Sequence, residues 1–160
     1  MLVICGTPAI AGKADPQLPQ QSIDDRTARS LSWMKGREIC DKARKDASLD
    51  NAQRLKICEN ILKQAFEREK AEATRPRDGF ERNFFWLGVA GIRTSLMGLT
   101  GEIDKVRSKR SCEYAVGADA ARSKIDRSQW PDKYLAYLEQ DATAKALLTA
   151  CRAEFPGLVG

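Results

Sequence analysis

The residues with the clearest chemistry in this 160-residue chain are its five cysteines, which are Cys5, Cys40, Cys58, Cys112 and Cys151. Zinc sites usually draw on Cys-x-x-Cys pairs and histidine, but no such pair occurs and the chain contains no histidine. The lack of histidine also removes the commonest general base and the Cys–His and Ser–His couples. We therefore expect no metal site and no cofactor. The cysteines should form disulfides outside the cytosol, or remain as reduced core thiols within it.

The cysteine positions predict two disulfides. Cys40 and Cys58 lie nine residues either side of position 49, the centre of a polar turn between two expected helices. An antiparallel helix pair would place them opposite each other, where close packing allows the Cα separation of about 5.5–6 Å that a disulfide prefers. Cys112 and Cys151 then pair by exclusion. On the loop-entropy model the two bridges would stabilise the fold by roughly 3 and 4 kcal/mol.

Carboxyl groups offer the remaining route to catalysis. Glu102 with Asp104, and Glu38 with Asp41, are pairs of the kind used in general acid–base chemistry. Acids two or three residues apart on a helix are ordinarily solvated surface groups. The sequence therefore predicts no catalytic residue and no enzyme activity.

Residues 1–11 are uncharged and mostly apolar, and they end in the small-x-small pattern of a signal-peptide cleavage site. We interpret them as a signal peptide that lacks its basic start. Its removal would take Cys5 away and leave an even number of cysteines. This predicts a periplasmic or secreted protein, and the alternative is a frayed cytosolic terminus. A phosphate-binding loop over Gly6–Lys13 is disfavoured, because five residues rather than four separate its glycines and Ala14 follows the lysine.

Helical periodicity dominates after a polar, extended leader at 12–21, and no alternating strand pattern appears. The sequence therefore predicts an all-α fold, a single compact bundle of about five to six helices over residues 22–156 that disulfides stabilise. The expected helices cover 22–45, 52–73, a long apolar segment from about 84 to 106, 112–121 with an interruption at Gly117 as one option, and 130–154. A turn at 46–51 and a linker at 74–79 separate the first three.

The long apolar segment carries the strongest pattern, because apolar residues from Phe85 to Val106 step alternately by four and three. Beside this seam runs a ridge of small residues, Gly88, Gly91, Ser95 and Gly98. Each glycine costs a helix about 1 kcal/mol relative to alanine. The ridge therefore predicts either close backbone packing or a break near 98–101. The stretch from 84 to 99 is shorter than the roughly 20 residues of a membrane span, so we expect no transmembrane helix.

Charge is spread along the chain. The 27 basic and 22 acidic residues are interleaved, and the net charge is +5. Only the run from Lys105 to Arg110 concentrates positive charge, with four basic residues in six, and we expect a solvated helix face there. Nucleic-acid binders usually show a stronger basic patch with stacking aromatics. We therefore predict no nucleic-acid partner.

Five short motifs lie in a characteristic order. They are Leu55-Lys-Ile-Cys58, Phe85-Trp-Leu-Gly88-Val-Ala-Gly91, Cys112, Tyr134-Leu135 and Ala153-Glu-Phe155-Pro156. From Leu55 to Pro156 the chain resembles small periplasmic immunity proteins of type VI secretion, which neutralise peptidoglycan-amidase effectors. That family often has cysteine where this chain has Trp86 and Gly157. The resemblance implies a helical, disulfide-bonded protein that binds a toxin and performs no catalysis.

The sequence thus predicts an exported helical binding protein with a protein partner, an immunity or inhibitor protein that blocks a cell-wall-degrading toxin. We expect a protruding loop from 117 to 134 as the contact element. Trp130 and Tyr134 are aromatic types enriched at binding hot spots, although core packing is their alternative role. Arg110 and Tyr114 lie on the same expected edge.

A second class of function is an extracytoplasmic structural or assembly component of a secretion or conjugation apparatus. In that case the ridge of small residues from Gly88 to Gly98 would be an interface between chains, and a homodimer is one form of it. Neither class needs a catalytic group.

Overall fold

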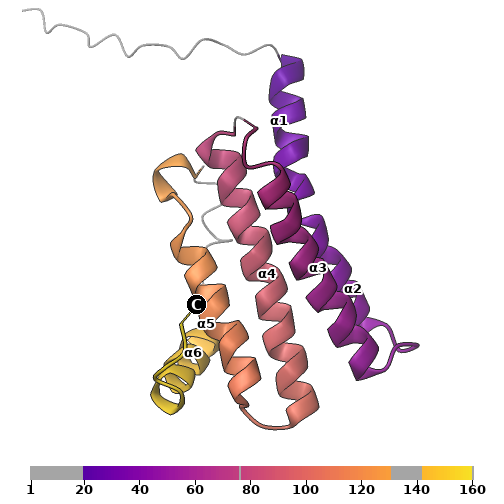
Figure 1. The fold of residues 1–160 in the computed structure, drawn as a ribbon, viewed down its shortest axis with the longest axis vertical. Helices are drawn as coiled ribbons and strands as arrows, with labels where there is room; N and C mark the ends of the chain where they lie inside the picture. The colour runs from indigo at the N-terminus through magenta and orange to yellow at the C-terminus, as the bar shows by residue number, and fades with distance from the viewer. Residues whose placement is uncertain (1–19, 76, 131–141, 160) are drawn as a thin grey trace, which may run out of the picture.

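The computed structural model describes residues 20–75, 77–130 and 142–159 (Figure 1). These contain α1 (Gln20–Ser32), α2 (Lys35–Lys45), α3 (Asn51–Ala71), α4 (Gly79–Asp104), α5 (Lys109–Ser123), the 3-10 helix η1 (Arg127–Gln129) and α6 (Ala142–Glu154). The described part contains no strand, so the predicted compact all-α fold is confirmed. The predicted signal peptide, most of the leader and the start of the predicted last helix after Trp130 lie outside the described residues.

Helix α4 is the centre of the bundle. Figure 1 shows α3, α4 and α5 side by side with α4 in the middle, while α2 packs against both α3 and α4. The predicted apolar seam faces inward, because Phe85, Val89, Ile92, Leu96 and Leu99 are each at most 1% exposed. Burying each large side chain stabilises the fold by about 1.5–3 kcal/mol. Within the described ranges, no helix combines the length and apolar character needed to cross a membrane.

The ridge of small residues on α4 is the surface on which α2 packs. A Cβ atom placed on Gly88 would lie only 2.4 Å from the carbonyl oxygen of Trp33, so the two backbones touch. Farther along, the hydroxyl of Ser95 donates a 2.6 Å hydrogen bond to the carboxylate of Asp41 on α2. Helix α4 continues through Gly98 to its end, so the alternative of a break there is wrong. Because α2 packs on this ridge, the ridge serves the close internal packing that was the first of the two alternatives.

The predicted first helix is in fact two helices. The chain leaves the α-helical path at Trp33 and Met34, whose N–H groups donate to carbonyls three residues back, at 3.2 and 2.9 Å. This tight turn lets the Trp33 carbonyl approach Gly88. It also directs the indole into the core, where it meets the ring of Phe85 edge-on at 5.2 Å. Trp33 and Met34 are themselves neither glycine nor proline, and the nearby Gly36 is already inside α2, so tertiary packing accounts for the break.

Both predicted disulfides are present. Cys40 and Cys58 join α2 to α3 with a Cα–Cα distance of 4.9 Å, and Cys112 and Cys151 join α5 to α6 at 5.3 Å. All four cysteines are 0% exposed. The Cys112–Cys151 bridge matters most for the placement of α6, because α6 packs mainly on α5.

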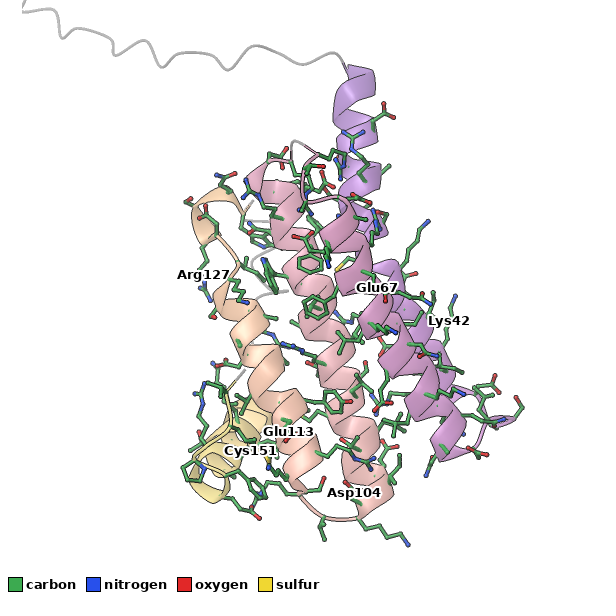
Figure 2. The ribbon with its side chains drawn as sticks, viewed as in Figure 1. Lys42, Glu67, Asp104, Glu113, Arg127 and Cys151 are labelled. Atoms are coloured by element: carbon green, nitrogen blue, oxygen red, sulfur yellow. A yellow bond between two sulfur atoms is a disulfide. The ribbon has the colours of Figure 1, made fainter. Side chains whose placement is uncertain are left out.

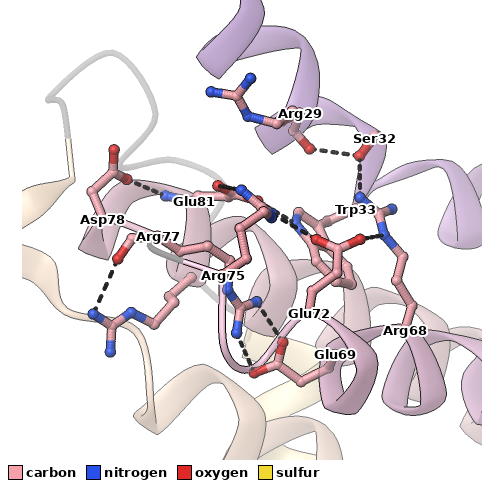
Figure 3. Close-up of polar contacts among 11 residues, drawn as sticks. Arg29, Ser32, Trp33, Arg68, Glu69, Glu72, Arg75, Arg77, Asp78 and Glu81 are labelled. Atoms are coloured by element: carbon pink, nitrogen blue, oxygen red, sulfur yellow. Dashed lines mark hydrogen bonds and ion pairs between the residues drawn. The ribbon is translucent and has the colours of Figure 1, made fainter.

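An ion-pair network ties the break between α1 and α2 to the connection between α3 and α4 (Figure 3). Its centre is Glu81, which is only 3% exposed in the first turn of α4. The Glu81 carboxylate accepts hydrogen bonds from Arg75 at 2.5 Å and from the indole N–H of Trp33 at 3.3 Å. Burial opposes ionisation of Glu81, but these two donors outweigh it and hold its pKa below the ordinary value.

The outer part of this network surrounds the same indole. The guanidinium of Arg68 lies 3.8 Å from the centre of the Trp33 ring and pairs with Glu72 at 2.8 Å. Arg77 makes two hydrogen bonds to the carboxylate of Glu69 at 2.5 and 3.0 Å. In the predicted linker at 74–79, Arg75 and Arg77 are therefore held by ion pairs with acids of the neighbouring elements.

We expect two glycines of α4 to respond in opposite ways to alanine. Gly88→Ala forces a methyl group into the Trp33 backbone and should lower the free energy of unfolding by about 1–3 kcal/mol. Gly101→Ala meets no atom within 4 Å and should raise it by about 0.5–1 kcal/mol, because alanine loses less entropy in a helix. Urea unfolding of the oxidised protein, followed by circular dichroism, measures both. Equal effects at the two positions would contradict the backbone contact.

Glu81→Gln should destabilise the protein by about 1.5–3 kcal/mol at pH 7, because it removes the charge that accepts buried hydrogen bonds. The folded pKa is depressed, so the ionised group contributes its full stability above the ordinary value of 4.5 and loses it as pH falls through the folded pKa. The difference between wild type and variant should therefore shrink toward acid pH. Glu67→Gln, at an exposed pair with Lys63, is the control and should change stability little.

Candidate partner-binding site

Two of the predicted contact residues do not form a surface site. Trp130 is only 5% exposed, and its ring packs in the core against Phe84 and Phe80, with ring centres 5.2 and 6.2 Å away. The prediction that Trp130 is presented to a partner is therefore wrong, and its alternative role in the core is what the structure shows. Tyr134 lies outside the described residues.

The predicted contact loop from 117 to 134 is also shorter than expected. Helix α5 runs without interruption through Gly117 to Ser123, because the guanidinium of Arg93 occupies the space beside Gly117 and donates a 2.6 Å hydrogen bond to its carbonyl. The described remainder, 124–130, is held to α4 by Asn83. The Asn83 side chain both donates to and accepts from the backbone of Asp126, at 2.8 Å each way.

The other two predicted contact residues lie at the surface and have structural bonds. The hydroxyl of Tyr114 on α5 donates to the carboxylate of Glu59 on α3 at 3.0 Å, which bridges the two helices that flank α4. Burial and this hydrogen bond raise the pKa of Tyr114 to about 12. Arg110, whose side chain is 41% exposed, pairs with Asp104 at 2.7 Å. Arg110 thereby stabilises the connection between α4 and α5.

That connection, residues 105–108, is the most unusual surface element of the described chain, and we call it the basic turn. It forms the lower end of the α4–α5 hairpin (Figures 1 and 2). Lys105 ends α4 in the left-handed conformation at φ 56°, and the hydroxyl of Ser108 caps α5 by accepting from the Ser111 N–H at 3.1 Å. Between them Val106 is 65% exposed. The prediction of a helix face for this basic run is therefore wrong over its first four residues, which form a turn.

The basic turn is held rigidly from both sides. The carboxylate of Asp104 accepts hydrogen bonds from the Ser108 hydroxyl and from Arg110, and these donors lower its pKa, with Ser108 the larger contributor. Arg107 pairs with Glu154 on α6 at 2.7 Å. Because Cys112–Cys151 fixes α6 on α5, the Arg107 contact anchors the turn to a covalently held element.

Two hollows flank the Arg107–Glu154 pair. Arg107 borders the first, a hollow of about 320 Å³ whose apolar walls come from Met97 on α4 and Leu147 on α6. Glu154 borders the second, about 740 Å³, whose walls come largely from 155–159. Both volumes fall within the range of small-ligand sites. Hollows, an exposed apolar side chain and uncompensated basic groups thus meet at one end of the molecule.

Three of the four acids in the pairs that could have supported catalysis, Glu102, Asp104 and Asp41, are bonded to neighbouring groups. Glu102 pairs with Arg44 at 3.0 Å and Asp104 with Arg110, while Asp41 accepts from Ser95. The described residues also contain no group of three or more possible metal ligands. What this end of the bundle offers chemically is recognition, through an apolar tip, basic side chains and a hollow.

Comparison with known proteins gives no relative: the sequence matches no family model and no curated protein, and no solved structure matches the fold. Function must therefore be argued from the site itself.

The basic turn contains several cleavage sites for trypsin, which makes its rigidity measurable. Asp104→Asn weakens the bonds from Ser108 and Arg110, and we expect cleavage after Lys105 and Arg107 to become several-fold faster under native conditions, because cleavage requires local opening. The matched control is Glu113→Gln, an exposed acid one turn into α5 that forms none of these bonds. Identical cleavage rates in wild type and Asp104→Asn would show that the carboxylate does not hold the turn.

Proposed function

We propose that this protein is an extracytoplasmic, non-catalytic inhibitor that binds a cell-wall-degrading enzyme through the basic turn. The observation that carries the proposal is the turn itself, an exposed apolar tip at Val106 among basic residues, anchored to a helix that a disulfide holds. A rigid contact element loses little entropy on binding, which favours affinity. A partner enzyme with an acidic cleft would complement it.

The disulfides support the extracytoplasmic part of the proposal. Disulfides persist in oxidising compartments and are rare in the cytosol. Both bridges are fully buried, and each joins two helices, so they strengthen a scaffold and are not arranged as an exposed redox pair.

The resemblance to periplasmic immunity proteins supports the choice of partner. Its motif cysteines, Cys58 and Cys112, each contribute to one of the two bridges. Its glycines Gly88 and Gly91 lie on the α4 surface that contacts Trp33 and Arg37. These four residues of the likeness, all in the described chain, are thus scaffold residues, while the basic turn lies between Gly91 and Cys112 in the sequence.

The test is inhibition of a peptidoglycan hydrolase, and the first to try is any that a neighbouring gene encodes. We expect the oxidised protein to inhibit release of dye from labelled peptidoglycan at a one-to-one ratio. Val106→Asp should weaken inhibition at least tenfold, about 1.4 kcal/mol, because it places a charge at the apolar tip. Leu31→Asp is the matched control, since Leu31 is 49% exposed on α1 at the opposite end of the molecule (Figure 1).

The two remaining outcomes oppose the proposal. A folded, oxidised sample that leaves the hydrolase fully active would exclude inhibition. Neighbouring genes for secretion or pilus components, together with binding to those components, would favour the assembly role instead.

A further inference from the structure

We propose that the 320 Å³ hollow beside the basic turn is a recognition pocket for one large apolar side chain of the partner that has a carboxylate beside it. This inference rests on the proposed function, since it specifies which partner segment the basic turn recognises. Neither the disulfide-linked helices nor the ion-pair network around Glu81 depends on this hollow for its own packing.

The shape of the hollow favours an apolar side chain. Met97 on α4 and Leu147 on α6 form apolar walls, and Gly101, also on α4, adds no side chain to the hollow. At Gly101 no heavy atom lies within 4 Å of where a Cβ atom would be, so the protein leaves that space unfilled. A volume near the lower limit of small-ligand sites suits one side chain better than an extended ligand.

The charges around the hollow favour a neighbouring carboxylate. Lys105 and Arg107 are its only charged lining residues among those described, and no acidic residue lines it. Arg107 already pairs with Glu154, whereas Lys105 makes no ion pair within the described chain. The ammonium group of Lys105 is thus available to an incoming carboxylate, and Val106 adds apolar contact between the two cations.

The hollow also has the rigidity that recognition requires. One wall belongs to α4, which is buried at the centre of the bundle, and the other belongs to α6, which Cys112–Cys151 holds in place. Basic residues around an exposed valine would also suit an anionic membrane surface. A flat bilayer would leave the hollow empty, so a partner side chain makes better use of this site.

The test uses a short peptide, acetyl-Gly-Leu-Asp-Gly-amide, titrated into the oxidised full chain with labelled methyl groups. We expect saturable shifts at the methyl groups of Met97, Val106 and Leu147. The matched peptide with asparagine in place of aspartate should bind at least threefold more weakly. Lys105→Gln should remove that difference between the two peptides while leaving the weaker binding intact.

A pair of glycine variants locates the peptide. Gly101→Leu places a side chain in the hollow at a position where the added Cβ meets no heavy atom within 4 Å, and it should abolish the shifts. Gly157→Leu, at a glycine whose Cβ position is equally open and that borders the larger hollow, should leave them unchanged. Shifts that survive Gly101→Leu, or equal affinity for both peptides, would falsify the pocket. So would binding to phosphatidylglycerol vesicles with no response to the peptide.

The failures of the two proposals can be told apart. If the peptide binds as expected but the hydrolase is not inhibited, the pocket stands and the proposed function falls. If Gly101→Leu inhibits the hydrolase as strongly as wild type, the function stands and the pocket is not part of it.

Discussion

The close approach of Gly88 to the carbonyl oxygen of Trp33 is the contact on which the bundle depends. It lets α2 lie directly on the α4 backbone, and it puts the chain break at a position where the Trp33 indole can enter the core and donate to Glu81. A side chain at position 88 would separate the two helices and withdraw that indole. Cys40 then fixes α3 to α2, so one backbone contact determines the placement of three helices around α4.

The other half of the molecule depends on α5 and its disulfide. Helix α5 packs closely along α4 because Gly117 leaves room for Arg93 between them. Helix α6 has its main contacts with α5, so its position relies on Cys112–Cys151 more than on a large shared core. This division explains why the candidate site lies where it does. The basic turn and its hollow lie between the buried helix α4 and helix α6, which a disulfide holds in place. The site is therefore open to a partner and still has little freedom to move.

Much of the fold could be predicted from local sequence patterns, whereas the incorrect predictions concerned features that depend on where helices end and on tertiary contacts. The spacing of the apolar seam and the symmetry of Cys40 and Cys58 about a turn are properties of helices themselves, so both predictions held. The break at Trp33 and Met34 falls on residues that do not themselves break helices, because it follows from contact with Gly88, 55 residues farther along the chain. Tryptophan is common both at interfaces and in cores, so the residue type alone could not place Trp130. Its contacts with the aromatic cluster show that it belongs to the core. Val106 continues the apolar period, but the helix ends before reaching it, so an expected core residue becomes an exposed tip.

The distribution of charge separates groups that stabilise the fold from groups available to a partner. At the end of the bundle near Trp33, the three cations Arg68, Arg75 and Arg77 each pair with an acid, and the acid that Arg75 binds is the buried Glu81. At the opposite end Lys105 and Lys109 make no ion pair within the described chain. A field that is uncompensated at one end orients an approaching acidic surface toward that end before contact, and it does so most strongly at low salt. Lys105 lies in the basic turn and Lys109 directly follows it, so an acidic partner surface would meet both of them there.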